Sequence, residues 1–315
     1  MPLDDRRLGA HLPLAAGMVK AVDRAHEIGA QAMQIFSDNP TAWQRRAEPP
    51  TELAAFRERL AVHDIGPVAI HAAYLVNLAG SDPTFFARSI EVLVHELRGA
   101  PSFGARFVNV HIGSHRDAGV EAGVGRVADA VALALAEVDE GSDAAMLVLE
   151  NSAGSGWGIG TDVGELAAIA DAVERRGVGA QRVGFCLDTA HAWGAGIDVG
   201  DPLAFDAFLD DFDARIGLHR LVMLHLNDSR SERGSRLDRH EHLGAGRIGH
   251  AGLAHVLRHP DLAHAAYFLE TPGMDEGYDA VNLQRARALA VGEPLAALPP
   301  AAFELRSSRA RTAPA

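Results

Sequence analysis

Short apolar runs recur along the chain, and between them lie stretches with the spacing of amphipathic helices. Eight of the runs have the length and composition of buried strands, at positions 8–12, 32–36, 68–70, 107–110, 146–149, 183–187, 221–224 and 267–269. The helix-like stretches lie at positions 15–28, 52–63, 85–98, 121–137, 163–175, 202–216, 251–258 and 278–290. Strands that alternate with helices predict an α/β fold with a parallel sheet, and eight such units predict a single (β/α)8 TIM barrel.

Six consecutive predicted strands end at an ionisable residue, in the order His71, His111, Glu150, Asp188, His225 and Glu270. The carboxyl ends of barrel strands meet on one face, where the loops build active sites. Six buried ionisable groups would each need a separate partner, whereas one metal cluster would satisfy them all. We therefore predict a metal site at the carboxyl ends of the strands.

The loop after the run at 221–224 supplies further candidate ligands. Asp238 and His240 are two residues apart, so on an extended segment both side chains point the same way and could bind one ion. Arg239 would then point to the other side, where a phosphate could meet it. His191 follows Asp188 by three residues and could serve a neighbouring ion.

Together these residues make nine candidate ligands: His71, His111, Glu150, Asp188, His191, His225, Asp238, His240 and Glu270. Mixed nitrogen and oxygen ligands suit zinc, with manganese or iron as alternatives. Nine ligands are too many for one tetrahedral ion and suit three ions that share a bridging carboxylate, for which Glu150 is the natural candidate. Zinc lowers the pKa of bound water to about 7, so such a site would make hydroxide at neutral pH and serve phosphodiester hydrolysis.

Composition limits the class of protein. Of the 315 residues, 48% are hydrophobic, which allows a large core and excludes global disorder. No apolar run approaches the roughly 18 residues of a membrane span, and the amino terminus lacks the features of a secretion signal. The single cysteine, Cys186, fits core packing in a reducing compartment. We therefore expect a cytoplasmic protein with no membrane partner, and a monomer, because one barrel with a built-in site needs no second subunit.

Two further features qualify this description. The net charge of −13 argues against non-specific coating of nucleic acid but leaves room for a local cationic site.

The barrel domain is expected at residues 1–291, and residues 292–315, rich in proline and alanine, are interpreted as a flexible C-terminal tail.

The other histidines are assigned lesser parts. We expect His11 to be either structural or a support for the metal ligands, His115 to support the ligands or cap a loop, and His242 to lie on the loop surface. Surface positions or ordinary packing are expected for His26, His63, His95, His219, His250, His255, His259 and His264.

At the candidate ligands the chain resembles the endonuclease IV family of apurinic/apyrimidinic (AP) endonucleases. The matching motifs follow one another as ungapped blocks: H-A-A-Y-L-V-N-L (71–78), V-N-V-H-I-G-S-H (108–115), L-E-N-S-A-G (149–154), C-L-D-T-A-H-A (186–192), H-L-N-D-S (225–229), S-R-L-D-R-H-E-H-L-G (235–244) and L-E-T (269–271). Jointly these blocks are specific, although a lone L-E-T would not be. The resemblance extends from about position 8 to about position 290.

The resemblance implies three zinc ions per chain, with Mn²⁺ as an alternative at one site. The first would be held by His71, His111 and Glu150, the second by Glu150, Asp188, His225 and Glu270, and the third by His191, Asp238 and His240. It also implies a DNA repair enzyme that uses metal-bound hydroxide to cleave the phosphodiester 5′ to an abasic site, leaving a 3′-hydroxyl, and that trims blocked 3′ ends. The implied partner is double-stranded DNA that carries such lesions.

The resemblance also assigns individual roles. Glu150 and Arg239 would be catalytic, with Arg239 neutralising charge that develops on the phosphate. Tyr74, Leu75 and Arg239 would contact DNA, the first two as a wedge in the gap left by an extruded nucleotide. Two positions depart from the family pattern: Thr41 stands where some members insert an arginine, and Pro13 stands where a serine is usual.

Two other functions remain as alternatives. A metal-dependent sugar isomerase or epimerase on a related barrel would use one or two ions and would not need His191, Asp238 and His240. A catalytically silent DNA-damage binder would have no reason to keep a complete ligand set.

Overall fold

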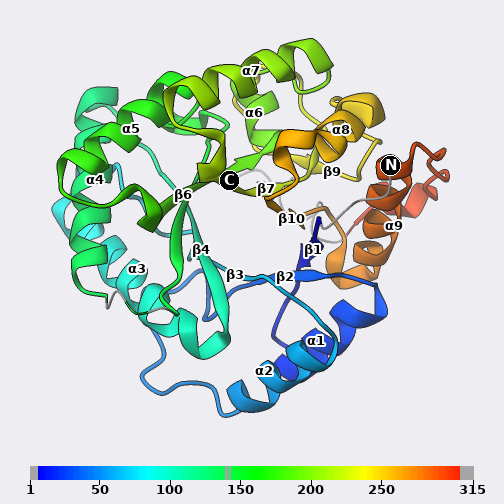
Figure 1. The fold of residues 1–315 in the computed structure, drawn as a ribbon, viewed down its shortest axis with the longest axis horizontal. Coiled ribbons are helices and arrows are strands. Elements are labelled where there is room, and N and C mark those ends of the chain that lie inside the picture. Colours follow the sequence, from blue (N-terminus) through cyan, green and yellow to red (C-terminus); the bar gives the residue numbers. More distant parts are fainter. Residues whose placement is uncertain (1–5, 139–140, 142, 306–315) are drawn as a thin grey trace.

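The computed structural model describes residues 6–138, 141 and 143–305. The predicted TIM barrel is confirmed: eight parallel strands close into a barrel in the order β1-β10-β7-β6-β5-β4-β3-β2 (Figure 1). They are β1 (Leu8–His11), β2 (Ala32–Ile35), β3 (Val68–His71), β4 (Ala105–His111), β5 (Met146–Glu150), β6 (Val183–Asp188), β7 (Leu221–His225) and β10 (Ala266–Leu269). Each of the eight predicted runs became one of these strands, because the runs are apolar throughout and parallel barrel strands are buried on both faces.

The helices form an outer ring around the strands (Figure 1). They are α1 (Met18–Glu27), α2 (Leu53–Val62), α3 (Pro83–Phe103), α4 (Val120–Ala136), α5 (Val163–Arg175), α6 (Thr189–Ala195), α7 (Pro202–Arg215), α8 (Gly249–Arg258) and α9 (Tyr278–Val291). Eight of them match predicted helices, and the short α6 was not predicted. None of the helices in the described part of the chain combines the length and the apolar character that a bilayer crossing would require.

Helix α3 is longer than the predicted stretch at 85–98, and its start has a clear cause. The side chain of Asp82 accepts hydrogen bonds from the backbone N–H groups of Thr84 and Phe85, and Pro83 occupies the first helical position. Both features are typical of helix starts. The helix ends where Gly104 adopts a left-handed conformation.

The core has two parts. The larger part lies between the barrel and its helices, and the smaller part fills the barrel interior with Ala32, Ala69, Phe107, Val148, Cys186, Met223, Ala266 and Phe268. Cys186 is buried in this interior layer, as core packing predicts. The layer closes the barrel, so the polar strand ends can face only the mouth.

The polar loop after β7 forms a small hairpin in which β8 (Asp228–Ser229) pairs antiparallel with β9 (His240–Glu241). Residues between these strands are held against α6. The indole nitrogen of Trp193 donates to the main-chain oxygen of Ser231 over 3.0 Å, and the N–H of Arg236 donates to the oxygen of Gly194 over 2.9 Å. This anchoring brings Asp238 to the barrel mouth.

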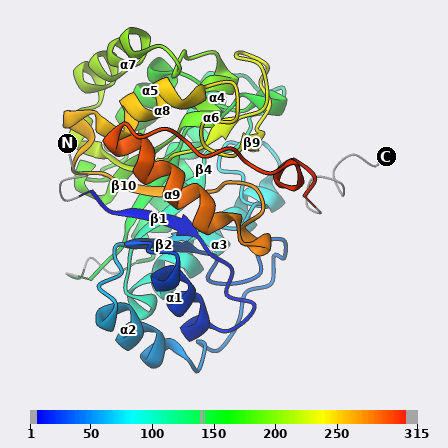
Figure 2. The ribbon, with the colours of Figure 1, turned by 90° about the vertical axis from the view of Figure 1, so that its right-hand side faces the viewer.

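Residues 292–305, which we assigned to a flexible tail, lie against the barrel. They cross α9 and reach the side of the molecule on which β9 lies (Figure 2). Ala302, in the short 3-10 helix η6 (Pro300–Phe303), and Leu305 are buried, and the oxygen of Ala296 accepts a hydrogen bond from Arg285. Residues 306–315 of the assigned tail lie outside the described residues.

Candidate metal centre

The six strand-terminal candidates converge on the barrel mouth. His71, His111, Glu150, Asp188 and His225 are the last residues of β3 to β7, and Glu270 directly follows β10. Strand register pairs His111 with Glu150 and Asp188 with His225. Because neighbouring strands end at the same level, their terminal side chains come together at one point.

The first group consists of His71, His111 and Glu150, whose ligand atoms all lie within 4.8 Å of one another. Nε2 of His71 is 3.7 Å from Oε2 of Glu150, and Nε2 of His111 is 3.5 Å from Oε1. Each imidazole therefore faces a different oxygen of one carboxylate.

The second group consists of Glu150, Asp188, His225 and Glu270 and meets the same 4.8 Å criterion. Nδ1 of His225 lies 3.3 Å from Oε1 of Glu150, 3.8 Å from Oδ2 of Asp188 and 3.3 Å from Oε2 of Glu270. Glu150 belongs to both the first and the second group, and it is fully buried between them. This is the geometry of a bridging carboxylate.

The third group lies nearer the solvent and joins Asp188, His191 and His240. Asp238 completes it, because its two oxygens lie 3.4 Å from Nε2 of His191 and 3.2 Å from Nε2 of His240. His191 is placed by α6, whose first turn is capped by the Asp188 carboxylate through the N–H of His191 over 2.8 Å. Asp188 thus touches two groups, whereas the resemblance assigned it to the second alone.

The groups shift one another's pKa values strongly. At Glu150 burial opposes the charge, but the imidazoles of His225 and His111 hold its pKa well below the usual range. At His191 burial is likewise outweighed, and the charges of Asp188 and Asp238 raise its pKa well above the ordinary value. The carboxylates of the mouth therefore favour positive charge on these neighbouring imidazoles, and metal cations would satisfy the same need.

The donor atoms fit metal ions of the zinc class. Among the described residues, Oε1 of Glu150, Nδ1 of His225 and Nε2 of His240 are buried side-chain atoms with no hydrogen-bond partner. Buried polar atoms are rarely left unpaired. Two ligands of one tetrahedral zinc, each at about 2.0–2.1 Å, stand roughly 3.3 Å apart, close to many of the separations above. These atoms thus face one another at ion-pair distances without forming hydrogen bonds, as the ligands of shared ions would.

Comparison with known proteins agrees with the resemblance found in the sequence. A family model described as "Xylose isomerase-like TIM barrel" matches residues 22–294. A protein named "Probable endonuclease 4" from Methanoculleus marisnigri is 40% identical over 283 residues, 90% of this chain and 98% of that protein. The crystal structure of endonuclease IV from Thermus thermophilus has a TM-score of 0.78 and 37% identity, covering 91% of this chain and 99% of that one.

This chain belongs to the endonuclease IV family. A D-tagatose 3-epimerase-like protein also matches, with a TM-score of 0.65 and 14% identity over 91% of this chain and 98% of that one, which shows a shared fold alone.

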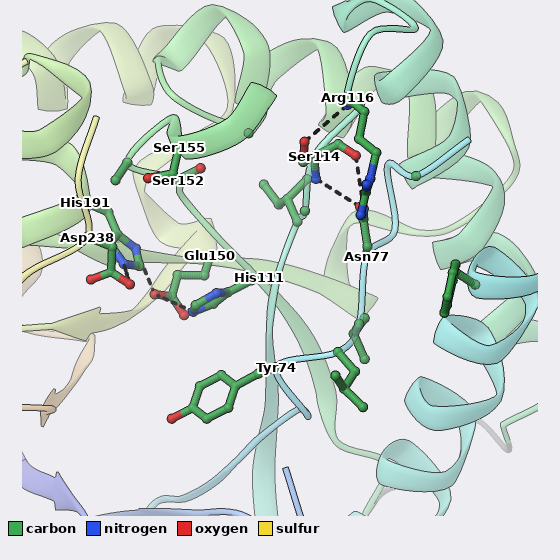
Figure 3. A pocket seen from close by; sticks show the side chains of 18 of the residues that line it. Tyr74, Asn77, His111, Ser114, Arg116, Glu150, Ser152, Ser155, His191 and Asp238 are labelled. Carbon is green, nitrogen blue, oxygen red and sulfur yellow. Dashed lines mark hydrogen bonds and ion pairs between the residues drawn. The ribbon is translucent and has the colours of Figure 1, made fainter. Parts of the chain in front are cut away.

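In this endonuclease IV family member, an open cleft of about 620 Å³ adjoins the candidate metal centre. Its lining includes the candidate ligands His111, Glu150, His191 and Asp238 and the loop residues Tyr74 and Leu75. Figure 3 shows Glu150 between His111 and His191, and the ring centroid of Tyr74 lies 5.8 Å from that of His71. Tyr74 is 60% exposed, and its ring packs edge-on against Phe36 at 5.1 Å. Arg239 is exposed and lies in the chain between the candidate ligands Asp238 and His240.

Several polar residues that support the ligands were missed by sequence reasoning. The Asn109 amide donates to Oε2 of Glu150 over 2.5 Å, and the Asn227 amide donates to Oδ2 of Asp188 over 2.7 Å. Gln34 is buried and contacts both His225 and Glu270. Two of these residues could have been found from the sequence, because Gln34 and Asn109 are single amides inside apolar runs. A polar group that points into the barrel needs a hydrogen-bond partner there.

The remaining histidines at the mouth divide into support and structure. His11 lies 3.3 Å from Oε1 of Glu270, so it adjoins the ligands. His115 caps a loop, since its Nδ1 accepts from the N–H of Gly119 over 3.0 Å. The expectation that His242 lies on the loop surface was wrong: it is fully buried, and its Nε2 donates to the oxygen of Ala302 over 2.9 Å.

Proposed function

We propose that this chain is a zinc-dependent AP endonuclease. It would hydrolyse the DNA phosphodiester 5′ to an abasic site, leave a 3′-hydroxyl, and also trim blocked 3′ ends. The observation that carries this proposal is the convergence of all nine candidate ligands around Glu150, Asp188 and Asp238 beside an open cleft. The names of the relatives and of the similar solved structure support the same activity.

The residues would divide three zinc ions among them, with Mn²⁺ as an alternative at one site. His71, His111 and Glu150 would hold the first, Glu150, Asp188, His225 and Glu270 the second, and His191, Asp238 and His240 the third. The chemistry that bound zinc supplies is the ionisation of water near neutral pH and the neutralisation of charge on a phosphodiester.

The chain's own residues would supply position and specificity. Glu150, as a buried bridge, would fix the separation of the first two ligand groups. Arg239 would approach the phosphate from the solvent side and stabilise its developing charge. Exposed Tyr74 and half-buried Leu75 would fill the gap beside an extruded nucleotide, and the cleft would receive that nucleotide.

The net negative charge of the chain is compatible with DNA binding only if the charges of the bound cations are counted. Three divalent cations would add six positive charges at the mouth of a chain whose net charge is −13. The DNA backbone would therefore be attracted to this face rather than to the surface in general. We infer that the chain works as a cytoplasmic monomer, which its mass in solution would test.

The sugar isomerase or epimerase is the second candidate, because the matching family model is described as a "Xylose isomerase-like TIM barrel". The third ligand group counts against it, because one or two ions would leave His191, Asp238 and His240 without a purpose. Metal content separates the two candidates: about three zinc ions per chain favours the nuclease, and one or two favours the isomerase.

The deciding experiment is incision of a duplex with one abasic site, with and without a zinc chelator. We expect a single cut on the 5′ side of the lesion, loss of cutting with chelator, and recovery after zinc is added back. An undamaged duplex of the same sequence is the control. A zinc-loaded protein that leaves the abasic duplex intact would refute the proposal.

A further inference from the structure

A second cluster of metal-ligating side chains lies on the outside of the barrel, between α7 and α8 in the outer ring (Figure 1). It consists of Asp206, His255 and His259, whose ligand atoms lie within 4.8 Å of one another. Nε2 of His255 is 2.5 Å from Oδ1 of Asp206, and Nε2 of His259 is 3.4 Å from the same oxygen. Both imidazoles therefore direct their Nε2 atom toward the same carboxylate oxygen, Oδ1 of Asp206.

The cluster is oriented by its surroundings. His255 lies in the last turn of α8 and His259 directly follows the helix, and their ring centroids lie 5.5 Å apart. Phe205, buried beneath them, meets both rings edge-on with centroids 6.2 and 6.3 Å away. The main-chain oxygen of His259 is fixed by Arg6 over 2.7 Å. The side chains are 42%, 29% and 12% exposed for Asp206, His255 and His259, which leaves water access on the outer side.

We propose that Asp206, His255 and His259 bind one divalent ion of the zinc class, with water completing its coordination. Two imidazoles and a carboxylate are a ligand set that suits zinc. The ion would add a link between α7 and α8 beyond the packing of Phe205 and the exposed ion pairs of Asp206, which are of small energetic value. Nδ1 of His259 is buried with no hydrogen-bond partner, so metal binding at Nε2 would place the ring proton where no acceptor receives it. This site should therefore bind more weakly than the third ligand group at the mouth, where the second ring nitrogens of His191 and His240 contact main-chain oxygens.

The test is titration of zinc-loaded protein, cleared of loose metal, with further Zn²⁺. We expect the parent and a His264→Ala control, which removes an exposed histidine elsewhere, to take up one more ion than the His255→Ala/His259→Ala variant. Added zinc should raise the melting temperature of the parent and leave that of the double variant unchanged. Incision of abasic DNA should be equal in all three proteins, which also shows that the variant is folded. Equal uptake by parent and double variant, or uptake only at millimolar zinc (an adventitious ion only), would overturn the proposal.

A separate observation concerns Gln34, which is fully buried in β2 beneath the mouth. Its Oε1 lies 3.0 Å from Nε2 of His225, and its Nε2 donates to Oε1 of Glu270 over 2.7 Å. One carboxamide therefore holds two candidate ligands of the second group at once.

The chemistry of the amide fixes how these ligands are presented. An amide oxygen only accepts, so the proton of a neutral His225 ring must lie on Nε2, and Nδ1 keeps its lone pair. Nδ1 is the atom that faces the oxygens of Glu150, Asp188 and Glu270. Because Oε1 of Glu270 is occupied by Gln34, Oε2 remains for the ion. A glutamate at position 34 would replace the donor by a negative charge beside Glu270.

We infer that Gln34 is a positioning residue that sets the affinity of the second ligand group for its ion. This inference rests on the proposed zinc centre, but its test does not require that DNA be the substrate. Loss of a residue that supports a metal ligand typically lowers metal affinity about 10- to 100-fold.

Zinc affinity would be measured by competition with a chromophoric chelator for Gln34→Glu, for Gln34→Met, which keeps the volume and adds no charge, and for the exposed control Gln31→Glu. We expect one of the three ions to be held about 10- to 100-fold more weakly in both position-34 variants, with the control unchanged. In the zinc-loaded protein, the Nε2 nitrogen and proton chemical shifts of His225 should change in Gln34→Met, because the hydrogen bond from Nε2 to Oε1 of Gln34 is lost. Parent-like affinity for every ion in Gln34→Met would overturn the inference, whatever the outcome of the incision assay.

Discussion

Nδ1 of His240 donates a hydrogen bond to the main-chain oxygen of Glu270 over 2.8 Å. His71 and His191 make contacts of the same kind, from Nδ1 to the main-chain oxygens of Ala72 and Asn151 over 2.7 and 3.0 Å. Because a main-chain oxygen only accepts, the neutral form of each ring carries its proton on Nδ1 and leaves Nε2 for a metal ion. The mouth is thus organised by the backbone before any ion binds.

Glu150→Gln should abolish incision of an abasic duplex and leave the fold intact. Glu150 offers one oxygen to His71 and the other to His111 and His225, and an amide nitrogen cannot replace either oxygen as a ligand. We expect a rate loss above about 100-fold, beyond what loss of a supporting residue costs, together with reduced zinc content. Circular dichroism would verify the fold, and Glu121→Gln, on the exposed start of α4, is the control. Near-parental rates would remove Glu150 from the mechanism.

Asp228→Ala should destabilise the protein substantially. This buried carboxylate accepts from the backbone N–H groups of Ser229, Gly246 and Ile248 over 2.8, 2.9 and 3.0 Å. It therefore ties the hairpin to the segment that leads into α8. Each donor left without a partner costs roughly 1–3 kcal/mol.

Denaturant unfolding would measure the loss in Asp228→Ala, with Asp210→Ala, at an exposed position of α7, as the control. A free energy of unfolding equal to that of the control would show that water replaces the lost acceptor, contrary to this expectation.

The sequence predicted the fold and the convergence of the strand-terminal ligands for the same physical reason. Each apolar run ends where the barrel interior meets the mouth, so the residue after the run lies at the mouth. This placement does not depend on where the helices begin and end. The third ligand group was harder to place from the sequence. The position of His191 is set by the short helix α6, and the start of α6 is stabilised by the Asp188 carboxylate, a contact that only the structure reveals.

His242 shows where sequence reasoning stopped. It follows two candidate ligands in a polar loop, and nothing local distinguishes it from a surface residue. Its burial comes from Ala302, which is far along the chain, and from Asn282 of α9, whose amide nitrogen lies 2.9 Å from Nδ1 of His242. Partners this distant leave no periodic signal in the sequence.

Glu96→Gln should stabilise the protein near neutral pH. Burial raises the pKa of the Glu96 carboxyl above its usual value, although Ser37 donates to it and Arg45 lies 3.3 Å away. A raised carboxyl pKa means that the folded state favours the protonated form. The penalty of the charged form is therefore complete above the folded pKa, and it is lost as the pH falls from there to the unfolded pKa.

Melting temperatures across an acid-to-neutral series would test this. The advantage of Glu96→Gln over the parent should be largest near neutral pH and shrink with acidification, while Glu91→Gln, on the exposed side of α3, should track the parent throughout. An advantage that stays constant with pH, or a variant that is less stable near neutral pH, would contradict the expectation.

Thr41→Arg should tighten binding to abasic DNA. Thr41 is exposed, and its hydroxyl donates to Oδ1 of Asn39 over 2.9 Å. The adjacent Pro40 oxygen accepts the N–H of Tyr74 over 3.0 Å, so this loop is joined to the residue that lines the cleft. An arginine here would reach DNA that occupies the cleft and add one cationic contact. At fixed salt we expect a lower dissociation constant, and the slope of log affinity against log salt should steepen by about 0.9 for that contact. Thr41→Gln, with a long uncharged side chain, should leave the salt slope unchanged. Unaltered or weaker binding by Thr41→Arg would place this loop away from the DNA.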